Sequence, residues 1–157
     1  MKFRKDLPEA GSGKTFVKLK DKESIQGIFI GDIHEFFTVW ENGKSRVVPE
    51  GTPKAGFRFR INFIVKEGAA YVPKIFENGP TLYSQLSDLH DEYGLENIVV
   101  KITRNGTGLD TTYTIMPLIK QQVTKDLAAH LATIELLKLE DKDSSGAANA
   151  GVDDLPF

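Results

Sequence analysis

The chain has 157 residues, no cysteine and a formal net charge of −2. This length suits one compact domain with tails. The lack of cysteine excludes disulfides, thiolate nucleophiles and cysteine-based metal sites. The sequence contains no apolar run long enough to span a membrane, and the charged start at 1–6 lacks the apolar core of a secretory signal.

The small net charge conceals an uneven distribution. Residues 1–66 contain thirteen basic and eight acidic side chains, a net charge of +5, whereas residues 135–157 contain two basic and six acidic side chains, a net charge of −4. A basic N-terminal half and an acidic end indicate a polyanionic partner and an interaction tail. A solvated surface with a solubilising end is the alternative.

The N-terminal third predicts a flexible arm followed by strands. Residues 1–14 are charged and contain Pro8, Gly11 and Gly13, which is typical of an arm. Apolar and β-branched residues over 15–31 predict the first strand. A hairpin is expected over 34–48, since Asn-Gly at 42–43 favours a tight turn between two β-prone runs.

Residues 57–66 give the clearest strand pattern in the chain. Period-two geometry places Phe57, Phe59, Ile61 and Phe63 on one face. The same geometry places Arg58, Arg60 and Asn62 in a row on the other, outward face. A turn at 66–68 leads into the next predicted strand, 69–76.

The C-terminal half predicts two helices and two strands. The start signal of the first helix lies at 78–81, with Pro80 in its first turn, and Gly94 ends it. Strands are predicted over 98–104 and 111–116. An apolar stripe at helical spacing predicts a second helix over 121–139. Residues 140–157 are too polar and too small to form a core, so we expect a disordered acidic tail.

This order of elements predicts a mainly β chain with an OB-fold, a five-stranded and partly open barrel. The domain would span 15–120, with one helix between strands 3 and 4. The hairpin at 34–48 would elaborate the L12 loop, and residues 105–110 would form the L45 loop. An OB-fold binds oligonucleotides on its strand 2–3 face and with these two loops.

Catalytic and metal-binding patterns are weak. Residues 11–15, Gly-Ser-Gly-Lys-Thr, end like a phosphate-binding P-loop, but Pro8 stands where the motif needs glycine, and a strand follows in place of a helix. His34, His90 and His130 have no metal-ligand spacing. We therefore expect no enzymatic activity, no cofactor and no metal.

Basic residues interleaved with aromatic residues remain, and single-strand binding needs cations for phosphates and rings on which bases stack. The predicted DNA-binding residues are Phe36, Trp40, Lys44, Arg46, Arg58, Arg60, Asn62, Tyr71, Lys74 and Arg104. An ordinary polar strand face is the alternative for the two arginines of 57–66. Phe36 fits the core equally well, and Trp40 fits either a buried anchor or a stacking platform.

Several segments resemble bacteriophage single-stranded-DNA-binding proteins of the OB-fold type: 15–21 (Thr-Phe-Val-Lys-Leu-Lys-Asp), 58–63 (Arg-Phe-Arg-Ile-Asn-Phe) and 100–110. The resemblance implies coating of exposed single strands in replication, recombination and repair, without catalysis, in the cytoplasm of the infected bacterium. Some phage relatives carry a cysteine-containing metal knuckle where this chain has 49–56. No cysteine occurs here, so the zinc is not carried over.

The last five residues, Asp153, Asp154, Leu155, Pro156 and Phe157, are similar to the acidic tip of bacterial single-stranded-DNA-binding proteins. The resemblance implies that this tip recruits replication or recombination proteins. Its carboxylates would also compete with DNA phosphates for the basic groove. Double-stranded DNA and RNA are the weaker candidate partners. The alternative function is a protein-interaction module with a β-barrel body and no nucleic-acid role.

Overall fold

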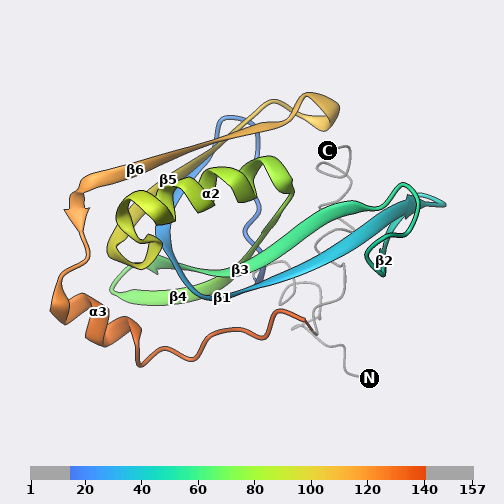
Figure 1. The fold of residues 1–157 in the computed structure, drawn as a ribbon. Helices are drawn as coiled ribbons and strands as arrows, with labels where there is room; N and C mark the ends of the chain where they lie inside the picture. The colour runs from blue at the N-terminus through green and yellow to red at the C-terminus, as the bar shows by residue number, and fades with distance from the viewer. Residues whose placement is uncertain (1–14, 141–157) are drawn as a thin grey trace, which may run out of the picture.

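The computed structural model describes residues 15–140, so the predicted arm at 1–14 and the tail from 141 onward lie outside the described residues. The fold is mainly β: six antiparallel strands form one open sheet in the order β4-β3-β1-β5-β6, and β2 pairs with β1 (Figure 1). The strands are β1 (Ser24–Glu41), β2 (Lys44–Val48), β3 (Gly56–Glu67), β4 (Ala70–Asn78), β5 (Ile98–Asn105) and β6 (Thr112–Gln122). The predicted barrel is not confirmed, since the described strand pairs do not join β4 to β6.

Strand β1 is long, and three other strands share it. Its start pairs with β5, its middle with β3 and its far end with β2. The β1–β3 register shifts between Ile30 and His34, and Gly31 has a φ of 87°. Such an irregularity bends a strand and increases its twist. The bend lets β1 pair with β5 at its start and with β2 at its far end.

The prediction of a first strand over 15–31 was wrong in its bounds. Strand β1 begins at Ser24 and continues to Glu41. The preceding segment crosses the sheet: Val17 N–H donates to the Ile75 carbonyl of β4 at 2.8 Å, and Lys22 N–H donates to the Arg104 carbonyl of β5 at 2.7 Å. Local alternation at 15–20 did not reveal that this segment connects two strands across the sheet.

The two predicted hairpins are confirmed. Glu41 pairs with Lys44 across Asn42 and Gly43, which have positive φ angles of 52° and 75°, as a two-residue hairpin turn requires. Strands β3 and β4 pair in register on either side of the turn at Gly68. The β1–β2 hairpin extends beyond the rest of the sheet, together with the start of β3 (Figure 1).

The main core lies between the sheet and α2 (Pro80–Tyr93). Phe59, Phe63 and Phe29 from β3 and β1 are fully buried, and α2 adds Leu82 and Leu86. The predicted apolar face of β3 is therefore confirmed. The predicted helix is also confirmed, with proline in its first turn and Gly94, at a φ of 78°, after its last residue.

Beyond α2, a short 3-10 helix η1 (Leu95–Asn97) leads into β5, and a second, η2 (Gly108–Asp110), lies in the β5–β6 hairpin. Strand β6 continues through Pro117 to Gln122, although the sequence predicted that it stops at residue 116. Strand β6 is the last strand of the sheet, and proline is tolerated on an edge because its missing N–H costs no ladder bond there.

The predicted helix over 121–139 was wrong in its extent. Helix α3 spans only Lys125–Leu131. The Thr133 hydroxyl donates to the His130 carbonyl at 2.6 Å, and the helix does not resume afterwards. Residues 134–140 instead follow an extended path along the sheet (Figure 1). An extended chain advances about 3.3 Å per residue and a helix about 1.5 Å, so these residues cover more of the sheet than they would as a helix. We name residues 134–140 the strap.

The sheet is covered on both faces (Figure 1). Helix α2 packs on one face, and α3 with the strap follows the opposite face. Leu131 packs with Ile28 and Ile64, while Leu139 packs with Phe16 and Ile75. Among residues 15–140, no helix has the length and apolar character needed to cross a membrane.

Candidate nucleic-acid interface

Six of the predicted DNA-binding residues lie on one face of the sheet, opposite α2. Residues directly opposite each other in antiparallel strands share a face. Arg58 lies opposite Phe36, Arg60 opposite His34, and Trp40 follows Phe36 at period two. We name this the outer face; its predicted DNA-binding members are Phe36, Trp40, Arg58, Arg60, Asn62 and Tyr71. The register therefore brings an aromatic row beside a basic row.

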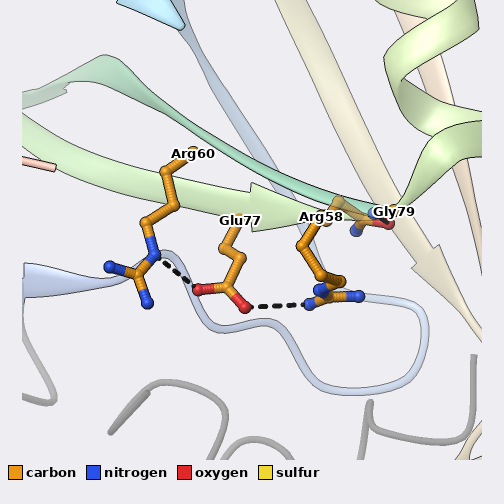
Figure 2. A network of polar contacts seen from close by, with 5 residues as sticks. Arg58, Arg60, Glu77 and Gly79 are labelled. Carbon is orange, nitrogen blue, oxygen red and sulfur yellow. Dashed lines mark hydrogen bonds and ion pairs between the residues drawn. The ribbon is translucent and has the colours of Figure 1, made fainter. Parts of the chain in front are cut away.

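Glu77 of β4 joins two arginines of this face. Its Oε2 accepts from Arg58 Nη2 at 3.1 Å, and its Oε1 accepts from Arg60 Nε at 2.8 Å. Figure 2 shows the carboxylate between the two guanidinium groups. The side chains of Arg60 and Glu77 are 2% and 8% exposed. Two cations share one anion, so the cluster keeps a net charge of +1 in a largely dry environment.

Arg60 and Asn62 are not exposed, so the expected solvent-facing row was wrong at these two positions. Arg60 Nη1 donates to the Leu139 carbonyl of the strap at 2.8 Å. Asn62 Nδ2 donates to the Leu137 carbonyl at 3.0 Å, and Asn62 Oδ1 accepts from Leu137 N–H at 2.8 Å. The strap covers this part of the outer face because these side chains bind its backbone.

The two aromatic residues of β1 differ in exposure. Phe36 is buried, with the Arg60 guanidinium 4.8 Å from its ring centroid and the His34 ring stacked at 5.5 Å. Trp40 is 48% exposed, and Val47, which shares its face of the β1–β2 hairpin, is 55% exposed. Trp40 is therefore not a buried anchor, while Phe36 lies in the packed part of the face.

Lys44 and Arg46 are exposed, but they lie on the other face of the hairpin from Trp40. Arg46 is opposite Val39 and Lys44 is opposite Glu41, whereas Ser45 is opposite Trp40. Arg46 Nη2 also forms an exposed ion pair with Glu41 Oε1 at 2.8 Å. These two cations therefore lie close to Trp40 along the hairpin but on the opposite face.

Three other predicted residues have local partners. Tyr71 is half-buried under α3, with its ring 5.5 Å from that of His130. Lys74 pairs with Glu67 at 3.4 Å and lies opposite Phe63, on the α2 side of the sheet. Arg104 is 4% exposed. It donates to the Leu19 carbonyl at 2.8 Å and so ties the N-terminal segment to the β5–β6 hairpin.

Sequence reasoning missed Glu77 and the strap. A signal for Glu77 existed: counting outward from the turn at Gly68 places it opposite Arg60. The strap had no comparable signal, because its apolar spacing also fits a helix. Its contacts with Asn62 join residues 75 positions apart in the chain.

On the α2 side, a cavity of about 320 Å³ lies between the bend of β1 and the helix. Phe29 and Phe59 line its apolar part, while Asp32 and Glu96 contribute carboxylates. Carboxylates repel phosphates, so this cavity does not suit a nucleic-acid backbone. Tyr83 also lines it; a hydrogen bond to Glu35 at 2.6 Å, then burial, then the negative charge of Glu35 raise the Tyr83 pKa.

No group of three histidine or acidic side chains within residues 15–140 is placed to hold a metal ion. Residues 11–14 of the P-loop-like segment and the acidic tip at 153–157 lie outside the described residues. Comparisons of the chain with protein families, with curated proteins and with solved structures found no match.

Proposed function

We propose that the chain binds single-stranded DNA with little sequence preference, along the outer face and starting from the exposed hairpin. The observation that carries the proposal is the strand register, which aligns exposed Trp40 with Arg58 and Arg60 on one face. Bases of any kind can stack on an aromatic ring, while cations follow the phosphates. Exposed Lys44 and Arg46 add positive charge at the hairpin.

The order of elements supports the same proposal. The five long strands are β1, β3, β4, β5 and β6 in chain order. Helix α2 lies between the third and fourth of them, and the short strand β2, which forms a hairpin with the end of β1, lies between the first and second. We propose that this is an OB-fold with an elaborated L12 loop. The usual ligand surface of that fold, the strand 2–3 face, then corresponds to the β3–β4 part of the outer face.

The cellular role that follows is coating of exposed single strands during phage replication, recombination and repair in the infected bacterium, with no catalytic step. The acidic residues 153–157 are proposed to recruit replication or recombination proteins. The resemblance of this tip and of residues 58–63 to phage and bacterial single-stranded-DNA-binding proteins supports this role.

The test is fluorescence anisotropy with a labelled oligo-dT and the full-length protein. We expect affinity to fall steeply between about 50 and 200 mM salt, since released counterions contribute to binding. Trp40→Ala should weaken binding about tenfold or more, because one base stack contributes about 1–3 kcal/mol. Ile119→Ala removes an equally exposed apolar side chain from β6 and should leave affinity unchanged.

A protein-interaction module is the alternative, and the exposed apolar pair Trp40 and Val47 favours it. It predicts that oligo-dT binding is absent, or that binding does not respond to Trp40→Ala or Arg58→Ala. Affinity that is equal at low and high salt would also refute the DNA proposal.

A further inference from the structure

The strap lies on part of the outer face, and we name the residues that hold it there the strap site: Arg60, Asn62, Phe16 and Ile75. The amide of Asn62 pairs with both backbone groups of Leu137, at 3.0 and 2.8 Å, as a neighbouring strand would. Arg60 Nη1 binds the next carbonyl but one, that of Leu139, at 2.8 Å. These three hydrogen bonds go to backbone atoms, so the polar side chains of the strap site recognise the main chain.

Leucine side chains of the strap also pack on the sheet. Leu139 is 8% exposed and packs with Phe16 and Ile75, and Leu137 packs against the same cluster. Leu136 packs with the cluster of Ile28 and Ile64. Apolar contacts therefore hold the strap along the same residues that form its hydrogen bonds, and at Leu136 just before them.

The same side chains stand where DNA would bind. A guanidinium suits phosphate and an asparagine amide suits a base edge, but the donors of Arg60 and Asn62 already serve the strap. The row from Trp40 to Asn62 is continuous, so a strand of DNA that stacks on Trp40 and continues past Arg58 meets the strap next. One set of donors cannot serve both occupants.

We propose that the strap and single-stranded DNA are alternative occupants of the strap site, so that DNA extending along the outer face displaces residues 134–140. This inference rests on the proposed function. Displacement leaves the sheet intact, because the strap pairs with side chains and forms no strand ladder with β3 or β4. When the strap site is already occupied, the apparent affinity for DNA is the intrinsic affinity multiplied by the fraction of molecules in which the site is free.

The direct test is amide hydrogen exchange in the full-length protein with and without saturating oligo-dT. Leu137 N–H is hydrogen-bonded to Asn62, so we expect slow exchange in the free protein and faster exchange when DNA is bound. Unchanged or slower exchange at Leu137 in the DNA complex would overturn the inference.

A variant pair gives an independent test. Leu139→Ala weakens the strap without touching a proposed DNA contact, and we expect it to tighten oligo-dT binding by several-fold to about tenfold. Leu86→Ala is the matched control: this leucine of α2 is 3% exposed in the core on the opposite face. It should lower stability without tightening binding.

Displacement of the strap is contradicted if Leu139→Ala and Leu86→Ala tighten oligo-dT binding equally, or if Leu139→Ala does not tighten it. The absence of oligo-dT binding by the wild-type protein overturns the proposed function, and this inference with it. Binding with an undisplaced strap overturns the inference alone, so the two failures are distinguishable.

Discussion

The two ends of the outer face differ sharply, although the long strand β1 runs through both. At the hairpin end, Trp40 and Val47 are about half exposed. At the strap end, Arg60 and Asn62 are 2% and 3% exposed, although both are polar. Side chains alternate between the two faces at both ends, so alternation does not explain the difference, which comes from a cover that a distant segment supplies at the strap end. A polar row on a strand therefore does not guarantee a solvated surface.

Burial at the strap end imposes a requirement that the hairpin end does not have. A buried polar group without a partner costs about 1–3 kcal/mol, and a buried unpaired charge costs more. Within residues 15–140, every buried side-chain nitrogen and oxygen has a hydrogen-bond partner. We therefore expect substitutions at the strap end to lower stability, and those at the hairpin end to affect binding.

The largest effect is expected for Glu77→Ala. It leaves Arg60 buried without its carboxylate, and we expect the free energy of unfolding to fall by about 3–5 kcal/mol. Glu41→Ala is the matched change at the hairpin end, where Glu41 pairs with exposed Arg46; it should cost at most about 0.5 kcal/mol. Urea denaturation measures both, and similar losses would contradict the comparison.

Asn62→Ala is expected to have an intermediate effect. Both backbone groups of Leu137 lose their partner in a partly buried place, so the free energy of unfolding should fall by about 2–3 kcal/mol. Asn105→Ala breaks an exposed hydrogen bond to Thr114 and should cost less than about 1 kcal/mol. If thermal and urea denaturation give the same loss for both variants, the strap contributes little to stability.

The smallest effect is expected on the other face of β1, where the Tyr83 hydroxyl donates to Glu35 at 2.6 Å. Tyr83→Phe should cost about 0.5–1 kcal/mol at neutral pH, since this bond is exposed. The pKa of Tyr83 is raised above its usual 10.0, so its stabilising effect is present below pH 10 and is lost as the pH rises through the folded-state pKa.

Denaturation of both proteins from pH 8 upward, as far as the fold survives, measures this difference. The stability gap between wild type and Tyr83→Phe should narrow above pH 10. A gap that widens at high pH would contradict the assigned hydrogen bond.

Short-range patterns predicted much of the fold. Asn42-Gly43 and the turn at Gly68 fixed two hairpins, because a two-residue turn determines the register of its strands. Alternation in β3 assigned its core face, and Pro80 with Gly94 bounded α2. The candidate site was predicted in part: Trp40 is exposed beside a basic row, whereas Arg104 and Lys74 belong to other contacts.

The sequence by itself determined which residues alternate along each strand and where the tight turns lie, because backbone geometry ties both to neighbouring residues. Only the tertiary structure decided which end of the outer face is open. Leu137 and Leu139 can follow either a helical stripe or an extended path. They take the extended path because Asn62 and Arg60 bind the strap backbone while Phe16 and Ile75 bury Leu139.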